Sequence, residues 1–436
     1  MPAKRGRPKA RPRATATLRS YLEERARFGI KFGLETMQEL TAALGHPERA
    51  FASLLVAGTN GKGSVTAYAD AGLRAAGLRV GRYTSPHLVR VHERIAVGGR
   101  DISELALARA VGAVRDAAAG LVAAGRLRAH PTYFETLTAA AFFHFKAAAV
   151  QVAVLEVGMG GRLDATNAAE PLASAIVSID YDHEGFLGTT LAAIAREKAG
   201  VLRPGRTTVL GPLPGEAQHA IATEAGARGA RLVCAYDGVS LRETAGGLEV
   251  TTPSGFYPGL RPLPGAHQRD NLVVALRLVE AVLAAGQAAD QGRVATGLTR
   301  VRWPGRLERI PGRPPLLLDG AHNPGGARAL ALYLEDQRPF VLLFGVMADK
   351  DARQLGETLF PLAREVVLTQ PPIERAATPQ EIAAHAGRVA ARAHQEPSVR
   401  RALALARRLA RPGETVVVAG SLYLVGAVTA LIKPRK

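Results

Sequence analysis

The sequence predicts an α/β protein built on parallel sheets. Apolar runs that end in glycine or polar residues, such as "FASLLVAG" (51–58) and "VQVAVLEVGMGG" (150–161), alternate with stretches of helical spacing, such as "FETLTAAAFFHFKAAA" (134–149). This alternation is typical of a parallel sheet that is covered by helices on both faces. The chain has 436 residues, of which 47% are hydrophobic, so we expect two or three domains with large cores.

The first part of the chain continues this rhythm up to about residue 238. Further strands are expected in the runs "VGRYT" (80–84), "IVSIDYDH" (176–183) and "RTTVLGP" (206–212), and further helices in 64–77 and 191–200. Residues 239–265 break the pattern with short β-like pieces and turns, and a helix over 269–286 follows them.

A second alternation begins after "RVRWPGRLERIPGRPP" (300–315), which has the composition of a linker. Strands are expected in "PLLLDGAHNP", "FVLLFGVM", "EVVLTQ" and "ETVVVAG", separated by three helices, with a last helix after Gly426. We therefore predict a tail over 1–17, a first domain over 18–302 and a second domain over 303–436.

Charge and cysteine content restrict the class of protein. The formal net charge is +18, and the only cysteine is Cys234, which excludes an internal disulfide and fits a reducing cytoplasm. No apolar run approaches the roughly 18 residues of a membrane span, and no secretory signal opens the chain. The basic tail resembles an AT-hook, but we interpret it as disordered, with only non-specific affinity for nucleic acid.

The segment "AGTNGKGS" (57–64) has features of a phosphate-binding loop without the standard G-x-x-x-x-G-K-[ST] spacing. Only Thr59 and Asn60 separate Gly58 from Gly61, and Gly63 follows Lys62. Its backbone N–H groups could converge on phosphate oxygens at a helix N-terminus, where Lys62 would add a positive charge. Taken alone, the segment is either a shortened nucleotide loop or a glycine-rich turn.

Candidate metal ligands follow three neighbouring strands. Ser85 follows "VGRYT", Glu156 ends a strand, and His183 is expected to end the strand "IVSIDYDH". Ligands gather at the carboxyl ends of parallel strands, and a hydroxyl, a carboxylate and an imidazole could hold Mg²⁺ there. Individually, Glu156 could cap a helix, His183 could satisfy a loop, and Ser85 could form a turn.

Motifs along nearly the whole chain resemble the folylpolyglutamate synthase and dihydrofolate synthase family of the Mur ligase group. In chain order they are "GTNGKGS", "YTSPHL", "LEVGMGGRLDATN", "SIDYDHEGFLG", "IAREKAGV", "WPGRLE", "LDGAHNP", "ADKD" and "GSLYLVG". The resemblance implies an N-terminal P-loop ATPase domain of the Mur ligase type with a parallel-rich sheet, and a smaller Rossmann-like C-terminal glutamate-ligase domain. The shortened loop is normal in that group, which favours the nucleotide-loop interpretation.

The resemblance implies ATP-driven addition of L-glutamate to dihydropteroate or folate through an acyl phosphate. The implied ATP contacts are Gly58, Thr59, Asn60, Gly61, Lys62, Gly63, Ser64, Asn271, Arg306 and Asp319. The implied ligands of two Mg²⁺ ions are Ser85, Glu156, His183 and Lys198, with Lys198 carried as a carbamate. Lys62, Lys198 and His322 are the implied catalytic residues.

Some of these residues also have purely structural interpretations. Lys198 could pair with Glu197 on a helix surface, Arg306 could form a surface ion pair, and Asp319 and His322 could belong to the turn that "NPG" predicts.

The pterin side of the resemblance is carried by three segments. The implied pocket residues are Ile30, Lys31, Phe32, Gly33, Thr132, Tyr133, Phe134, Glu135, Leu163, Asp164 and Ala165. Phe134 could stack on a pterin ring or belong to the core. Lys31 stands where we expect a variable or acidic residue, which makes this segment the weakest match.

Two other functions remain alternatives: a Mur-type ligase for a different precursor, and a P-loop protein that binds nucleic acid. Aromatics make up only 5% of the chain, and no basic or aromatic stripe accompanies the tail, which disfavours the second. The motifs do not separate dihydrofolate synthase from folylpolyglutamate synthase. We expect a monomer with small-molecule substrates and no membrane partner.

Overall fold

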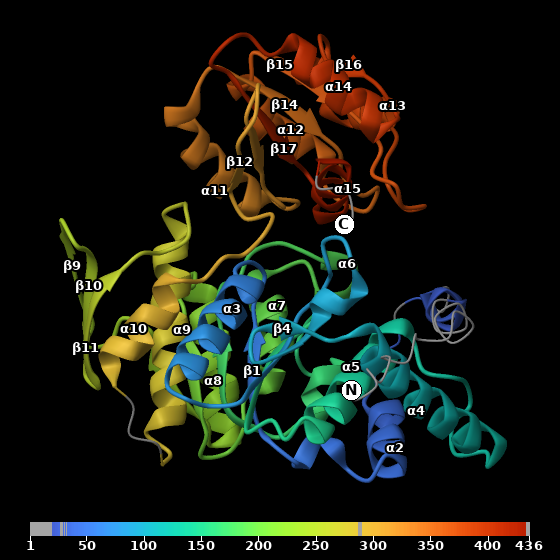
Figure 1. Cartoon of the computed structure of the whole chain (residues 1–436), viewed down its shortest axis with the longest axis vertical. Helices are drawn as coiled ribbons and strands as arrows, with labels where there is room; N and C mark the ends of the chain where they lie inside the picture. Colours follow the sequence, from blue (N-terminus) through green and yellow to red (C-terminus); the bar gives the residue numbers. More distant parts are fainter. Residues whose placement is uncertain (1–19, 27–28, 30, 32, 287–289, 433–436) are drawn as a thin grey trace, which may run out of the picture.

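The computed structural model describes residues 20–26, 29, 31, 33–286 and 290–432, and the predicted tail (1–17) lies outside them. Two bodies are seen in Figure 1, a larger one built from the N-terminal part of the chain and a smaller C-terminal one above it. The predicted α/β class is confirmed. The domain boundary near residue 302 stays a prediction, although the strands of the third sheet begin only at residue 308.

The first sheet is parallel except at one edge. Among the described residues its order is β4-β3-β2-β5-β1-β6-β7-β8, and only the pairs β2–β3 and β3–β4 are antiparallel. The strands are β1 (Ala52–Ala57), β2 (Val80–Tyr83), β3 (Ile95–Val97), β4 (Arg100–Asp101), β5 (Val152–Glu156), β6 (Pro171–Ile176), β7 (Thr207–Leu210) and β8 (Arg231–Cys234).

Helices cover both faces of this sheet. Along β1, Leu54 and Val56 belong to one core cluster and Leu55 and Ala57 to the other, as the alternation of side chains in a strand requires. The first cluster also holds buried residues of α3 (Lys62–Ala75), α9 (His267–Leu283) and α10 (Gln291–Thr299). The second holds those of α2 (Glu35–Ala43), α4 (Glu104–Ala123), α5 (Tyr133–Ala147), α7 (Leu191–Lys198) and α8 (Gly215–Arg228).

A small antiparallel sheet accounts for the irregular stretch expected over 239–265. Its order is β11-β10-β9, formed by β9 (Ser240–Thr244), β10 (Gly247–Thr252) and β11 (Gly255–Leu260). Leu248, Val250 and Leu260 are buried in the core cluster of α9 and α10, so this sheet extends the first domain.

The third sheet forms the smaller body, with the order β12-β13-β17-β14-β15-β16 and antiparallel pairing only between β12 and β13. Its strands are β12 (Glu308–Ile310), β13 (Leu316–Leu318), β14 (Phe340–Phe344), β15 (Glu365–Leu368), β16 (His394–Gln395) and β17 (Thr415–Ala419). Its helices are α11 (Pro324–Leu334), α12 (Ala352–Leu359), α13 (Pro379–Ala386), α14 (Val399–Leu409) and α15 (Leu422–Ile432).

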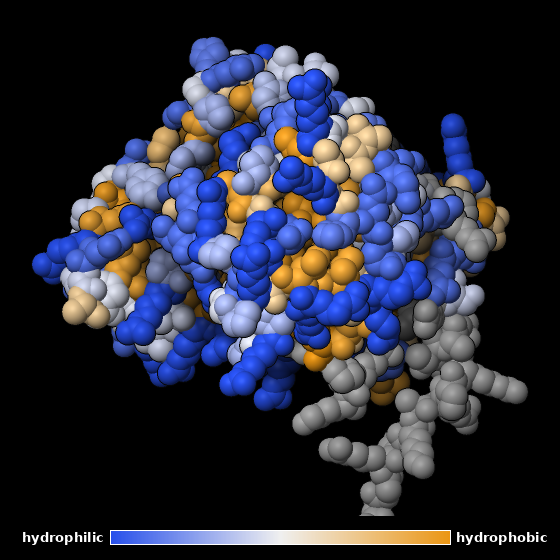
Figure 2. Space-filling model, turned by 90° about the horizontal axis from the view of Figure 1, so that it is seen from above, coloured by the Kyte–Doolittle hydropathy of each residue, from blue (hydrophilic) through white to orange (hydrophobic). Residues whose placement is uncertain are grey.

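Figure 2, seen from the end of the smaller body, shows hydrophobic areas separated by hydrophilic side chains. Within the described ranges, no helix is both long enough and apolar enough to cross a membrane.

Three sequence expectations about elements were wrong. Strand β6 ends at Ile176, and His183 instead precedes the short helix α6 (Glu184–Leu187), because residues 178–183 leave the sheet and bond the glycine-rich loop through Ser178 and Asp180. The connection from β15 to β17 contains α13, β16 and α14 rather than one helix, so four helices, not three, separate the expected strands.

The third error concerns Gly426, which lies inside α15 and does not precede it. A Cβ at this position would lie 1.9 Å from the carbonyl oxygen of Leu88, in the first body. The glycine therefore permits close contact between the helix and a loop of the other body, and does not interrupt the helix.

Replacing Gly426 should test this contact. Gly426→Ala must displace α15 from the Leu88 backbone, so we expect it to lower the free energy of unfolding by about 1–3 kcal/mol, as overpacking does. Chemical denaturation monitored by circular dichroism measures the change.

Gly112→Ala is the matched control, since it lies in α4 with open space around its added Cβ. Helix propensity alone should make that variant more stable by up to about 1 kcal/mol. Equal stabilisation by both substitutions would contradict the close contact.

Candidate active site

The glycine-rich loop turns from β1 into α3 in a conformation that needs glycine. Gly61 precedes the helix with φ +83°, and a Cβ there would lie 2.3 Å from Oδ1 of Asn271. Both the left-handed backbone and the close side chain therefore exclude other residues. With Lys62 as the first helical residue, the free N–H groups of α3 face the cavity that the loop lines, an arrangement suited to an anion.

The loop is fixed by the segment that follows β6. Thr59 donates its N–H to the carbonyl of Ser178 (2.8 Å), and its hydroxyl accepts from the N–H of Asp180 (3.1 Å). The hydroxyl of Ser178 accepts the N–H of Asn60 and donates to its carbonyl, both at 2.9 Å. The loop is thus held before any ligand binds.

Two lysines share one acceptor behind the loop. Lys62 and Lys198 each donate to the carbonyl of Gly58 at 2.9 Å, and Lys62 also reaches the carbonyl of Thr59 at 3.0 Å. Lys198 is only 4% exposed. Burial, followed by the charge of Lys62, lowers the pKa of Lys198 to about 7. Burial also lowers the pKa of Lys62, although Glu156 and Asp182 oppose the shift.

Ser85, Glu156 and His183 line one cavity of about 370 Å³ together with the loop. Glu156 is buried at the end of β5 and accepts the N–H of Ser85 (3.0 Å). Burial raises the pKa of Glu156 against the effect of Lys62. Burial also lowers the pKa of His183 to about 4, so its imidazole is neutral and able to bind a metal.

These three donors fit a divalent cation of the Mg²⁺ or Mn²⁺ type, because carboxylate and hydroxyl oxygens suit such ions. In the part of the chain that is described, no group of three or more His, Cys, Asp and Glu side chains could hold a metal. Any cation here would therefore depend on the Ser85 hydroxyl and on ligands from outside the chain. The described residues that line the cavity do not include Lys198.

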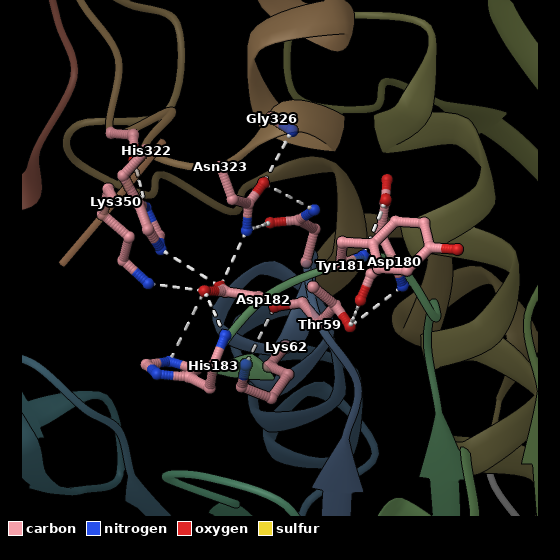
Figure 3. Close-up of polar contacts among 12 residues, drawn as sticks. Thr59, Lys62, Asp180, Tyr181, Asp182, His183, His322, Asn323, Gly326 and Lys350 are labelled. Atoms are coloured by element: carbon pink, nitrogen blue, oxygen red, sulfur yellow. Dashed lines mark hydrogen bonds and ion pairs between the residues drawn. The ribbon is translucent and has the colours of Figure 1, made fainter. Parts of the chain in front are cut away.

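Asp182 joins the two bodies at the centre of the site (Figure 3). Its carboxylate accepts from Lys350 and from Nδ2 of Asn323 (2.9 Å), both from the C-terminal body, and lies 3.7 Å from Nε2 of His322. Burial alone would raise the pKa of Asp182, but His183, Lys350 and His322 outweigh it and hold the pKa below its usual range. The carboxylate therefore stays ionised.

A second link joins the glycine-rich loop directly to the C-terminal body. The side-chain amides of Asn60 and Asn323 bond reciprocally, at 3.1 and 2.9 Å. Asn323 also caps α11 by accepting the N–H of Gly326 (2.9 Å). The side-chain amide of Asn323 thus caps α11 at the predicted "NPG" turn and also holds this turn against the glycine-rich loop.

Arg306 and Asp319 lie where the linker enters the third sheet. Asp319, 8% exposed, accepts the N–H groups of Leu307 and Ala321, both at 2.9 Å, so it fixes the linker beside the end of β13. Arg306 lines the 370 Å³ cavity, and its guanidinium packs so close to Gly320 that a Cβ there would lie 2.3 Å from Nη1.

Asn271 lies against the loop through α9. Its Nδ2 donates to Gln268 (3.1 Å), and Gln268 donates to the hydroxyl of Ser64 (3.2 Å). Asn271 and Ser64 are both buried. The nucleotide contacts expected from the sequence line this one cavity, except Gly58, which is not among its lining residues.

The expected pterin residues line a second cavity of about 400 Å³. Those described and lining it are Lys31, Gly33, Thr132, Tyr133, Phe134, Glu135, Leu163, Asp164 and Ala165, whereas Ile30 and Phe32 lie outside the described residues. Thr132 and Glu135 form the capping box that starts α5. The other carboxylate oxygen of Glu135 is buried without a hydrogen-bond partner in the described structure.

Sequence reasoning missed several residues of this site. Asp182 was expected at a strand end and Asn323 in a turn, but neither was given a role in the site. The segments "ADKD" and "GSLYLVG" were matched without roles, although Lys350, Leu422 and Tyr423 line the second cavity. The two cavities share Ser85, His183 and His322 as lining residues. The phosphate loop and the apolar pocket thus meet at these side chains.

Removal of the Asp182 charge should loosen the contact between the two bodies. Asp182→Asn leaves the buried Lys350 ammonium without its nearest carboxylate, and breaking such a pair costs about 3–5 kcal/mol. We expect hydrogen–deuterium exchange measured by mass spectrometry to become at least about tenfold faster in peptides covering 319–326.

Asp116→Asn, on the exposed face of α4, is the control for charge loss and should leave these peptides unchanged. Equal protection in both variants would show that Asp182 does not hold the bodies together.

Comparison with known proteins matches residues 305–422 to the family described as "Mur ligase, glutamate ligase domain". The chain is 37% identical to a protein of Halobacterium salinarum named "Probable bifunctional folylpolyglutamate synthase/dihydropteroate synthase", over 93% of this chain but only 50% of that protein. The chain thus spans about half the length of that relative. It is 35% identical to the dihydrofolate synthase/folylpolyglutamate synthase of Bacillus subtilis, over 80% of this chain and 83% of the relative.

Solved structures agree with the sequence relatives. The folylpolyglutamate synthase of Mycobacterium tuberculosis complexed with ADP superposes with a TM-score of 0.90 at 33% identity, covering 97% of this chain and 99% of that one. A bifunctional folylpolyglutamate synthase/dihydrofolate synthase with Mn, AMPPNP and L-glutamate bound superposes with a TM-score of 0.83 at 32% identity, covering 96% and 98%. The chain therefore belongs to the folylpolyglutamate synthase/dihydrofolate synthase family of Mur ligases.

Proposed function

We propose that the protein is an ATP-dependent ligase that joins L-glutamate to dihydropteroate, to folate polyglutamate chains, or to both. The observation that carries this proposal is the junction of the two cavities at Ser85, His183 and His322. One cavity offers an anion-binding loop and cations, and the other offers an apolar pocket large enough for a pterin. The relatives' ADP, AMPPNP, Mn and L-glutamate complexes support this division.

The proposed reaction has two steps. An oxygen of the substrate carboxylate attacks the γ-phosphorus of ATP, the bond from that phosphorus to the β-phosphate oxygen breaks, and ADP leaves. The amino group of glutamate then attacks the acyl carbon, the bond from this carbon to the phosphate oxygen breaks, and phosphate and one proton leave. Lys62 and Arg306 would neutralise phosphate oxygens, and a divalent cation held by Ser85, Glu156 and His183 would supply further positive charge.

His322 is suited to accept the proton of the glutamate amine. Its Nδ1 lies 2.8 Å from the carbonyl of Gly320, which can only accept, so Nδ1 carries the hydrogen and Nε2 keeps its lone pair. Burial lowers the pKa of His322, which keeps the ring neutral. Asp182, 3.7 Å from Nε2, would stabilise the imidazolium that forms.

The pterin pocket is proposed for the apolar cavity. Phe134 packs over Gly158, where a Cβ would lie 2.6 Å from its ring, and the ring can offer a face to a flat heterocycle. The unpartnered oxygen of Glu135 could accept from a pterin N–H group. Lys31 donates to Thr36 (2.7 Å) at the margin of this cavity, and its role in binding stays a proposal.

We also propose that the protein is a monomer, because described residues of one chain line both cavities, and a single species with the mass of one chain in light scattering would test it. We further propose a cytoplasmic location, supported by the single cysteine, and fractionation of cells would test it.

The substrates are tested by release of ADP in the presence of L-glutamate. We expect dihydropteroate and tetrahydrofolate each to stimulate ATP use at least about tenfold over the rate without a pterin, because the acceptor carboxylate is a reactant. Turnover with one pterin alone would assign the protein to one of the two activities. The variant Lys62→Ala, without the loop ammonium, should show little ATP use. If neither pterin stimulates the wild type, the proposed reaction is wrong.

We also propose that Lys198 works as a carbamate. In the structure the side-chain amines of Lys198 and Lys62 both donate to the buried carbonyl oxygen of Gly58, so their positive charges repel each other. Attack of the neutral amine on CO₂ forms an N–C bond, releases one proton to water and reverses the charge. A carbamate oxygen could then serve a second cation.

The pH dependence follows from the pKa of about 7 for Lys198. The neutral amine, which alone takes up CO₂, becomes the major form as pH rises through 7, so activation by bicarbonate should increase across pH 6–8 and then level off. A ¹³C carbamate signal from the protein with labelled bicarbonate measures the modification directly.

Two substitutions separate the carbamate from a plain lysine. Lys198→Arg should lose about 100-fold in kcat or more and resist rescue, whereas added short carboxylates should restore part of the activity of Lys198→Ala. Wild-type turnover by Lys198→Arg would exclude the modification.

A further inference from the structure

A third cavity, of about 630 Å³, lies away from the two that form the candidate active site. It is bounded by one face of α3, by α10 and by the start of the linker, and it shares no lining residue with the other two cavities. Its α3 wall carries small residues at successive turns, Ala67, Ala71 and Ala75. The volume is that of a small-molecule site.

Arginine dominates the charge of this cavity. Its lining includes Arg74, Arg82, Arg293, Arg300 and Arg302 against two carboxylates, Asp70 and Asp290. Asp70 is 1% exposed and is shared by Arg74 (3.1 Å) and Arg82 (3.5 Å), while Asp290 caps α10 by accepting the N–H groups of Gly292 and Arg293. Both carboxylates are therefore engaged, and a net positive charge faces the cavity.

Much of the guanidinium donor capacity in this cavity is unused. The Nε of Arg82 is buried and has no hydrogen-bond partner within the described structure. Among the described residues, no ion pair to a carboxylate involves the side chains of Arg293, Arg300 or Arg302. An unpartnered buried donor is costly unless a ligand or water satisfies it, and planar guanidinium groups bind phosphate and carboxylate oxygens in pairs.

The chemistry of the lining indicates a compact ligand. None of the described residues that line the cavity is an aromatic on which a nucleobase could stack, and the apolar ones are alanines and Val301. Several guanidinium groups around one hollow favour a small molecule with closely spaced anionic oxygens over a single chloride or an extended nucleic-acid strand. We propose that this cavity is a second anion site, which binds a small oligophosphate or oligocarboxylate outside the nucleotide cavity.

The proposed site is joined to the linker and the glycine-rich loop. The guanidinium of Arg82 lies 5.0 Å from the centre of the Trp303 ring, and a Cβ on Gly63 would lie 3.0 Å from Nε1 of that ring. Arg300 and Arg302 precede Trp303 in the linker. An anion that binds Arg82 and Arg302 therefore lies next to a ring that packs on the loop.

The fluorescence of Trp303 can report binding at this cavity, because Trp303 is the only tryptophan of the chain. The full-length protein, with its nucleotide cavity filled by a saturating concentration of ADP, is titrated with inorganic tripolyphosphate or with tri-γ-glutamate at constant ionic strength, and binding is followed by calorimetry and by tryptophan fluorescence. We expect one saturable event per chain with a Kd below about 1 mM and a fluorescence change with the same midpoint. Binding of either anion supports the site, and the anion that binds shows whether the natural ligand is a phosphate or a carboxylate. The titration with tri-γ-glutamate rests on the proposed function, whereas the titration with tripolyphosphate does not.

Variants decide where the anion binds. Arg293→Gln/Arg300→Gln removes two exposed guanidinium groups and should raise the Kd at least about tenfold. Arg128→Gln/Arg206→Gln removes the same charge elsewhere on the surface and should leave it unchanged, since neither residue lines the cavity. Lys62→Ala should also keep the event, because its ammonium belongs to the nucleotide cavity.

Three results would overturn the proposal. In the first, neither anion binds in the calorimetric titration. In the second, Lys62→Ala abolishes binding whereas Arg293→Gln/Arg300→Gln does not change it. In the third, short single-stranded RNA binds and neither small anion does.

Discussion

One buried carboxylate, that of Asp182, makes the rest of the site possible. It extends from the segment after β6 and accepts donors from Lys350 and Asn323 on the other body. Because it is buried, its charge would be costly without these partners, and the partners would be equally costly without it. The same segment holds the glycine-rich loop through Ser178 and Asp180. The geometry of the loop and the closeness of the two bodies thus depend on one short stretch of chain.

This arrangement brings together chemistry that neither body has alone. The first body supplies the loop and Glu156, the second supplies His322 and Lys350, and both bodies line the apolar pocket. In the proposed reaction, the acyl phosphate would lie between them, where a site shielded from water would protect it. Lys198 stands apart, because it touches the site only through the Gly58 carbonyl. Because Lys198 is buried behind the loop, a change in its charge would act on phosphates bound at the loop, although the side chain itself is not exposed to solvent.

Much of the fold could be predicted from the sequence because apolar strands and amphipathic helices have distinct periods. Glu156 and Ser85 follow their strands as expected, since strand ends carry local signals. The place of His183 could not be read this way, because the apolar pattern of 176–179 continues past the end of the hydrogen-bonded strand. Asp182 and Lys350 are 168 residues apart, and no local pattern relates them. The purpose of Gly426 likewise depends on Leu88, a distant partner.

The paired amides of Asn60 and Asn323 have a consequence for how this protein can vary. Each amide gives one hydrogen and receives one from the other, a match that serine, aspartate or histidine at one position cannot reproduce. An exchange at Asn323 would remove both bonds of the Asn60 side chain, and an exchange at Asn60 would remove two of the four bonds of the Asn323 side chain, next to a loop that must keep its shape. The two positions are therefore expected to drift together through evolution or to stay fixed, although 263 residues separate them along the chain.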